Sequence, residues 1–438
     1  MVPRSTADVV IIGGGPAGST AAILLAEAGH RVVLLDKDRH PRFHIGESLL
    51  PANLPLFERL GVADEIRAVG MQKWGAEFVS PWHGRAETFQ FSEAWDKSQP
   101  YAYQVRRSVF DEILLRRAGH QGATVIEGCR ARDVQFHDEP ASVVVTADSD
   151  DGSRLSWDTR FLIDASGRDT FLANHFGIKR RNRKHSSAAL YGHFAGAVRH
   201  IGQPAGNISI YWFEHGWFWF IPLADGATSV GAVVWPYYSK SRTVPVREFF
   251  LNTIQLCPPL AQRLAAATLL TEVEATGNYS YAADRCHGSN YLLLGDAYAF
   301  IDPVFSSGVW LAMNSAVAGA TAVEACLSHQ QRAPVALKEF ARVMRHGPKT
   351  FSWFIYRVTS PAMRELFMHP KNPMRMKEAL LSVLSGDIFK TTPIWTSLAA
   401  FKGVYFVSAM ANLSRSLTAW RRRQANLRQA LHDQPASP

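Results

Sequence analysis

Cysteines are few in this sequence of 438 residues, and they are far apart. The four cysteines, Cys129, Cys257, Cys286 and Cys326, include no pair at the spacing of a metal site or a redox centre. We interpret them as isolated thiols and predict no metal site. Such cysteine usage is typical of a reducing compartment, so we expect a cytoplasmic protein.

Long apolar runs are also missing. No stretch reaches the roughly 20 apolar residues that a transmembrane helix needs. The apolar segment at 9–25 is interrupted by four glycines and a proline between positions 13 and 18, which distinguishes it from a signal peptide. We therefore expect no transmembrane segment.

Acidic residues are outnumbered. The chain carries 47 lysines and arginines against 38 aspartates and glutamates, a net charge of +9. This balance favours anionic partners, but no zinc module or arginine-rich groove accompanies it, so we discount nucleic acid. Much of the excess lies late in the chain, because Asp433 is the single acid in 401–438.

A glycine-rich turn follows the first predicted strand, 7–12. The pattern is Gly13-x-Gly15-x-x-Gly18, and it leads into a predicted helix at 19–28 and a second strand, 31–35, which ends at Asp36. Glycines allow the backbone to approach a pyrophosphate, and the N-terminus of the helix offers N–H groups to the phosphates. Asp36 is placed to bind ribose hydroxyls. The pattern predicts a dinucleotide site.

The pattern of strands and helices predicts an α/β protein in several pieces. Residues 1–185 supply the first pieces of the nucleotide-binding domain, with a small strand insertion near 76–105. Residues 186–290 predict a mainly antiparallel β-sheet domain, with one helix over 247–267. Residues 291–330 return to the nucleotide-binding domain. Residues 331–438 predict helices broken at Pro361, Pro370, Pro373 and Pro393, with a disordered tail at 433–438.

An aromatic strand is predicted at 216–223, Gly-Trp-Phe-Trp-Phe-Ile-Pro-Leu. Side chains alternate along a strand, so Trp217, Trp219 and Ile221 share one face. Two neighbouring indoles make a rigid surface that excludes water. The simplest interpretation is sheet core, and the alternative is a wall between two compartments.

Taken together, these motifs resemble the flavin-dependent halogenases, a branch of the flavoprotein fold of the p-hydroxybenzoate hydroxylase type. The resemblance covers roughly residues 5–330. It rests on the glycine turn, on Arg107-x-x-Phe110-Asp111-x-x-Leu114, on Gly295-Asp296, on Trp217-x-Trp219-x-Ile221-Pro222 and on Phe300-x-x-Pro303-x-x-Ser306-x-Gly308. Lys73 matches the position of the family's catalytic lysine.

The resemblance implies an enzyme of secondary-metabolite biosynthesis that uses reduced FAD. A flavin hydroperoxide would convert chloride or bromide to hypohalous acid, which reaches an aromatic substrate held elsewhere. Lys73 would act on the hypohalous acid, either as an ammonium donor or as a haloamine. Trp217 and Trp219 would separate the substrate from the flavin. The implied FAD contacts are Gly13, Gly15, Pro16, Ala17, Gly18, Asp36, Lys37, Ser48, Arg107, Asp296, Pro303, Gly308 and Val309, and the amides of Ser307 and Gly308 would bind the halide.

Phe305 departs from one branch of that family. Tryptophan halogenases have a glutamate at this position, where it assists removal of the ring proton. The sequence therefore resembles the branch that halogenates phenols or pyrroles, free or tethered to an acyl or peptidyl carrier protein. No second dinucleotide fingerprint is present, which favours a separate flavin reductase as partner.

Two other functions fit part of the pattern. An FAD-dependent aromatic monooxygenase or reductase would explain the glycine turn, Arg107 and Asp296, but neither Lys73 nor the paired tryptophans. A non-catalytic flavoprotein that docks in a biosynthetic assembly would suit the basic C-terminal segment.

Overall fold

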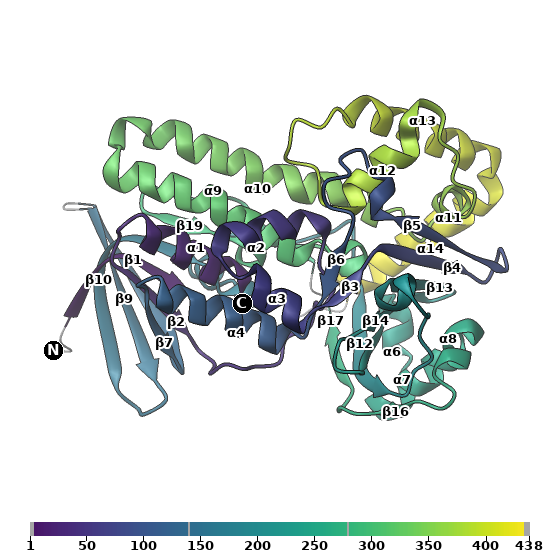
Figure 1. The fold of residues 1–438 in the computed structure, drawn as a ribbon, viewed down its shortest axis with the longest axis horizontal. Helices are drawn as coiled ribbons and strands as arrows, with labels where there is room; N and C mark the ends of the chain where they lie inside the picture. The colour runs from purple at the N-terminus through teal and green to yellow at the C-terminus, as the bar shows by residue number, and fades with distance from the viewer. Residues whose placement is uncertain (1–3, 139–140, 278–279, 433–438) are drawn as a thin grey trace.

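Two sheets lie side by side along the long axis of the molecule (Figure 1). The computed structural model describes residues 4–138, 141–277 and 280–432. The tail at 433–438, for which the sequence predicts disorder, lies outside the described residues.

The first sheet is organised around β1, whose residues Val9–Ile12 are buried on both faces as a central parallel strand requires. Its two neighbours and the outer strands β7 and β19 run parallel, and β9 and β8 add an antiparallel ribbon. The strands in spatial order are β7 (Thr124–Glu127), β2 (Val32–Asp36), β1 (Arg4–Ile12), β10 (Arg154–Asp164), β9 (Ala141–Ser149) and β8 (Cys129–Asp138), with β19 (Tyr291–Leu293) paired to β10.

Helices cover this sheet. Helix α1 packs between α4 and α9, and α10 packs on α9 (Figure 1). Of the described helices, α9 alone is long and apolar enough to cross a membrane, but it is mostly buried in the core between α1 and α10. The helices of this half are α1 (Pro16–Glu27), α2 (Leu54–Leu60), α3 (Ala63–Val69), α4 (Arg107–His120), α5 (Phe171–His175), α9 (Gly308–Ser328) and α10 (Ala333–Ile355).

The second sheet is antiparallel except where β13 pairs with β4 in parallel. Of the strands in the predicted insertion near 76–105, β4 and β5 form the outer edge of this sheet, whereas the strand at 102–104 pairs elsewhere. In spatial order the strands are β16 (Thr268–Leu269), β12 (Ala188–Ala195), β15 (Thr228–Val234), β14 (Gly216–Pro222), β13 (Ile208–Phe213), β4 (Gly75–Ser80) and β5 (Arg85–Gln90), with β17 (Glu274–Gly277) paired to β12.

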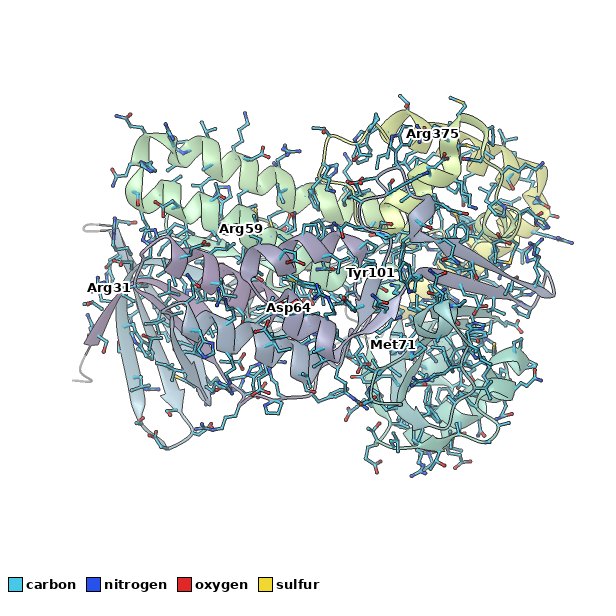
Figure 2. All side chains as sticks on the ribbon, in the orientation of Figure 1. Arg31, Arg59, Asp64, Met71, Tyr101 and Arg375 are labelled. Carbon is cyan, nitrogen blue, oxygen red and sulfur yellow. The ribbon has the colours of Figure 1, made fainter. Side chains whose placement is uncertain are left out.

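Two small ribbons lie at the junction of the two halves. β3 (Met71–Lys73) pairs with β6 (Ala102–Gln104), and Figure 2 labels Met71, the first residue of β3, between the two sheets. The other ribbon is formed by β11 (Lys179–Arg181), β18 (Tyr281–Ala283) and β20 (Ala299–Phe300). Lys73 is therefore placed by the junction and not by either sheet.

Prolines divide the remaining helices. The helix predicted over 247–267 is two helices, because Pro258 follows Cys257 and begins the second one. The sequence predicts a helix break at Pro361, and in the structure Pro361 is the first residue of α11. Pro348, in contrast, lies inside α10. These helices are α6 (Pro236–Lys240), α7 (Val246–Gln255), α8 (Pro258–Arg263), α11 (Pro361–Met368), α12 (Met376–Leu384), α13 (Trp395–Ala411) and α14 (Leu413–His432).

The aromatic strand is β14, and its inner face packs into a large apolar core with α10 to α13. Trp219 lies opposite Gly231 of β15, and the indole covers that glycine. A Cβ on Gly231 would lie 2.2 Å from the Trp219 ring. The missing side chain at 231 is thus what lets the indole lie flat against the sheet.

We predict that Gly231→Ala destabilises the protein by about 1–3 kcal/mol, because the new methyl group overpacks the core against Trp219. Chemical unfolding measures the change. Gly403→Ala is the control, since a Cβ there meets open space in α13 and should stabilise by roughly 0.5–1 kcal/mol. Wild-type stability of Gly231→Ala would show that the indole does not depend on this glycine.

Candidate functional site

The glycine turn closes tightly between β1 and α1. Gly13 has φ +104, and a Cβ on Gly18 would lie 1.8 Å from the carbonyl oxygen of Gly13. Gly15 is the N-cap of α1, and Pro16 follows as its first residue. Gly13 is therefore required for its backbone conformation, and Gly18 for the close approach of α1 to the turn. Gly15 leaves room beside the N-terminus of α1.

Asp36 lies at the end of β2 beside this turn. Its carboxylate accepts hydrogen bonds from the N–H groups of Gly14, at 2.6 Å, and Asp38, at 2.8 Å. Arg42 lies over the turn, with its guanidinium 3.8 Å from Asp36 and 3.4 Å from Asp111. The sequence analysis missed Arg42, because its position depends on the loop after β2 and no local motif marks it.

Arg107 and Asp296 lie farther along the same cavity. Arg107, at the start of α4, makes a bidentate ion pair with buried Asp111 at 2.7 and 2.9 Å and donates to the Ile45 carbonyl. Asp296 follows β19, where Gly295 donates its N–H to Ser315 of α9. Burial raises the pKa of Asp296 to about 6, and Arg107 and Arg168 oppose this shift. Arg107 thus stabilises the Asp296 carboxylate across the cavity.

These groups line one cavity of about 1460 Å³. That exceeds the roughly 300–1,000 Å³ of drug-sized ligand sites, so a dinucleotide has room. The N-termini of α1 and α9 both open into it, and helix N-termini favour phosphates and other anions. The residues present therefore fit FAD. Of the predicted contacts, the cavity wall includes Gly13, Gly15, Pro16, Ala17, Asp36, Lys37, Ser48, Arg107, Asp296, Pro303, Gly308 and Val309.

Gly18 is absent from that wall, because it lies behind the turn against Gly13. Lys37 is at the rim, where its ammonium pairs with Asp169 at 2.5 Å and is partly exposed. Glu47 is a further buried acid of the wall that the sequence analysis did not single out. It pairs with His193 of β12 at 2.8 Å, and no local sequence signal connects these two residues.

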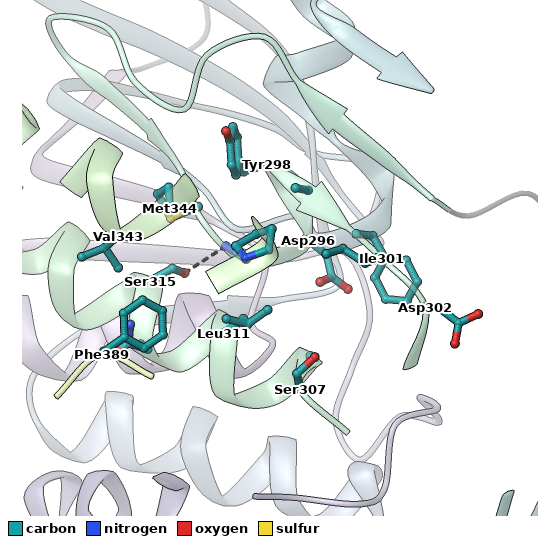
Figure 3. Close-up of a pocket in the computed structure, with 16 residues that line it drawn as sticks. Asp296, Tyr298, Ile301, Asp302, Ser307, Leu311, Ser315, Val343, Met344 and Phe389 are labelled. Atoms are coloured by element: carbon teal, nitrogen blue, oxygen red, sulfur yellow. Dashed lines mark hydrogen bonds between the residues drawn. The ribbon is translucent and has the colours of Figure 1, made fainter. Parts of the chain in front are cut away.

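The predicted halide turn precedes α9. Ser306 has φ +56, a left-handed conformation that is uncommon outside glycine, and α9 begins at Gly308. Ser307 and Gly308 line a second cavity of about 40 Å³ together with Asp296. Figure 3 shows Ser307 at the start of α9 and the Asp302 carboxylate directed away from it. Ser307 is the N-cap of α9 and Gly308 its first residue, so their backbone N–H groups have no partner within the helix.

Lys73 is buried between the large cavity and the apolar core. Its ammonium donates to Ser48 Oγ at 2.9 Å and to the Leu49 carbonyl at 3.0 Å, and it lies 5.2 Å from the centre of the Phe91 ring. Burial lowers the pKa of Lys73 to about 7. Lys73 does not line the cavity itself. Its hydrogen-bond partner Ser48 does, so Lys73 is connected to the cavity through Ser48.

Trp217 and Trp219 form a buried pair on β14, with ring centres 6.1 Å apart. Both line the large cavity. Trp217 also lines a separate small cavity with His185 and Val358. Trp217 therefore lies between two cavities.

Comparisons with known proteins agree with this site. Residues 6–337 match the FAD binding domain family. The tryptophan 2-halogenase of Chondromyces crocatus is 36% identical over 75% of this chain and 62% of its own length. The 1H-pyrrole-2-carbonyl-[peptidyl-carrier protein] chlorinase of Pseudomonas fluorescens is 30% identical over 87% of this chain and 89% of its own length.

Solved structures show the same fold. A flavoprotein/dehydrogenase from Cytophaga hutchinsonii has a TM-score of 0.84 at 28% identity, covering 93% of this chain and all of that one. The myxobacterial chondrochloren halogenase has a TM-score of 0.77 at 35% identity, covering 90% of this chain and 93% of that one.

The lowered pKa of Lys73 predicts a pH dependence of stability. The unfolded state holds the lysine proton up to pH about 10.5, whereas the folded state releases it near pH 7. Between these values the unfolded state binds more protons, so folding stability rises with pH. The free energy of unfolding of wild type, relative to that of Lys73→Met, should therefore rise by about 1.4 kcal/mol per pH unit between pH 7.5 and 9. Below pH 6.5 this difference should not change with pH. Urea unfolding measures this gain.

The control for that experiment is Lys371→Met, at an exposed lysine. Its stability difference from wild type should stay flat over the same range. A flat difference for Lys73→Met as well would mean that the Lys73 ammonium keeps its ordinary pKa.

Proposed function

The chain belongs to the flavin-dependent halogenases, and we propose that it halogenates an electron-rich phenol or pyrrole through Lys73. It is an FAD-dependent oxidoreductase. The observation that carries the proposal is a lysine buried between the dinucleotide cavity and an aromatic wall, with its pKa lowered to about 7.

Bound reduced FAD, with oxygen, supplies the oxidising equivalent that converts a halide to hypohalous acid. The chain's own contribution begins with the halide. We infer that the N–H groups of Ser307 and Gly308, at the positive end of α9, hold the halide near Asp296, because a helix N-terminus attracts an anion.

Lys73 then acts on hypohalous acid. A pKa near 7 means that both the ammonium and the neutral amine are populated at neutral pH. The ammonium can donate to the oxygen of hypohalous acid and make its halogen more electrophilic, and the amine can carry the halogen as a haloamine. Ser48 and the Leu49 carbonyl hold the nitrogen in place for either role.

The wall of Trp217 and Trp219 keeps the organic substrate away from the flavin. Their rings are buried and share the face of β14 that packs against α10 and α11. We place the substrate beyond this wall, where Phe305 packs edge-on against Phe354. The substrate side is thus apolar and aromatic, which suits a flat ring.

Phe305 supports a phenol or pyrrole substrate. It is buried in the apolar core and offers no proton acceptor to a ring carbon. A phenolate supplies its own charge and a pyrrole nitrogen activates its α-carbons, so both rings need less help than an indole. One relative is a tryptophan 2-halogenase, so free tryptophan is the comparison substrate in the assay below.

Two further partners and a cellular location complete the proposal. A relative acts on a pyrrole held on a peptidyl carrier protein, so this chain's substrate is proposed to arrive free or on such a carrier. A separate flavin reductase would supply reduced FAD. The described cysteines are free thiols, which suits the reducing cytoplasm as location.

We predict that Lys73→Ala removes halogenated product and still consumes reduced flavin and oxygen, because Lys73 acts only after the halide has been oxidised. Mass spectrometry measures the halogenated product, and an oxygen electrode measures the consumption of oxygen. Lys377→Ala, at a surface ion pair with Glu93, is the control and should match wild type. Full product yield from Lys73→Ala would remove this lysine from the reaction.

We also predict that free tryptophan is a poorer substrate than a phenol or a pyrrole carboxylate. The reason is Phe305, which cannot accept the ring proton. The assay compares tryptophan, a simple phenol and pyrrole-2-carboxylate, the last both free and carrier-bound, with chloride and with bromide. Faster turnover of tryptophan than of all the others would contradict the assignment. Phe305→Glu should not create a tryptophan halogenase, because burial raises the pKa of a new carboxyl there.

A further inference from the structure

A buried histidine from the second sheet's side of the molecule contacts the turn that leads to α9. His185 precedes β12, and its Nε2 lies 2.9 Å from Asp302 Oδ2. Ser187 donates to the same oxygen at 3.2 Å. All three residues are almost fully buried. Neither the glycine turn, nor the tryptophan wall, nor Lys73 needs this cluster, so the proposed reaction leaves it without a role.

Asp302 connects the cluster to the halide turn. Its other oxygen, Oδ1, accepts the N–H of Val304 at 3.2 Å and so caps the short helical turn Pro303–Phe305. That turn ends at Ser306, whose positive φ is a strained conformation for a residue with a side chain. Ser307 and Gly308 follow directly. A chain of contacts therefore runs from His185 through Asp302 to the backbone that faces the anion.

The surroundings of His185 hold its ring in one orientation. The ring stacks on Tyr356, with centres 5.8 Å apart, and meets Trp235 edge-on at 6.2 Å. Among the residues that the structure describes, its Nδ1 has no hydrogen-bond partner. The fixed ring thus directs Nε2 at Asp302, with Ser187 Oγ as a second and longer contact at 3.4 Å.

We propose that His185 is a positioning residue for the halide: it fixes Asp302, and Asp302 fixes the turn whose Ser307 and Gly308 amides bind the ion. This inference rests on the proposed function, because it takes these amides as the halide site. Halide affinity then depends on a residue that does not touch the halide. The strained Ser306 explains why the turn needs such support.

The test compares two substitutions, one that keeps the aromatic ring of His185 and one that keeps its hydrogen-bond donor. His185→Phe keeps an aromatic ring against Tyr356 and Trp235 but removes the donor to Asp302. His185→Gln keeps an N–H donor at similar reach but loses the ring. Each protein is loaded with FAD and titrated with sodium bromide at constant ionic strength, with sodium gluconate as the balancing salt. The thermal midpoint reports bromide binding without turnover.

We expect His185→Phe to bind bromide about tenfold more weakly, the effect of one lost charge-assisted hydrogen bond. His185→Gln should stay within about twofold of wild type. In turnover assays, the KM for bromide should rise in His185→Phe while kcat at saturating bromide changes little. FAD occupancy, read from absorbance, should be equal in all three proteins.

Two results would overturn the inference: unchanged bromide affinity in His185→Phe, or an equal loss in both variants, which would assign the effect to ring packing. If His185→Phe does not fold, Ser187→Ala replaces it, with an expected two- to threefold loss, and an unchanged affinity there counts against the inference. The proposed function fails separately, when wild type binds bromide at this turn yet halogenates no ring.

Discussion

The burial of one ammonium group constrains the architecture around the site. Among the described residues, Lys73 has no carboxylate at ion-pair distance, and its hydrogen bonds go to Ser48 and to the Leu49 carbonyl. A buried cation with only neutral partners is costly, and the chain lowers that cost by lowering the lysine pKa. The small ribbon of β3 and β6 holds Lys73 at the junction of the two halves, where neither sheet could place it. The unfavourable burial is what produces a reactive amine near neutral pH.

In the proposed reaction, the two halves of the molecule hold different parts of the site. The first sheet presents the glycine turn and the N-termini of α1 and α9 to an anionic cofactor, and the second presents a dry aromatic wall. The groups that connect them come from loops: Ser48 beside Lys73, Glu47 against His193, and Asp302 against His185. Each pair joins residues more than 20 positions apart in the sequence, so the geometry of the site depends on how the two halves pack.

This dependence explains what the sequence could predict. Local patterns of glycines, alternating apolar residues and a proline mark the glycine turn, the strand at 216–223 and the helix after Ser307. The structure has all three elements. The fold class and the family follow from such patterns. The break at Cys257–Pro258 had a local signal too, but helical periodicity on both sides outweighed it. β8 has no comparable local pattern, because its burial does not alternate regularly and a bulge interrupts its pairing.

The site residues that the sequence analysis did not identify are those that no local sequence pattern indicates. Arg42 takes its place over the glycine turn only because the loop after β2 folds back on it, and Glu47 finds His193 only when the sheets meet. Lys73 could be assigned from its setting in the sequence, but its burial behind Ser48 could not. That burial sharpens the chemistry, because an exposed lysine would stay protonated at neutral pH and could serve only as a donor, whereas a buried one also has the neutral amine available. In the proposed reaction, the burial that sets the protonation of Lys73 thus also defines the chemistry with which this residue would receive hypohalous acid.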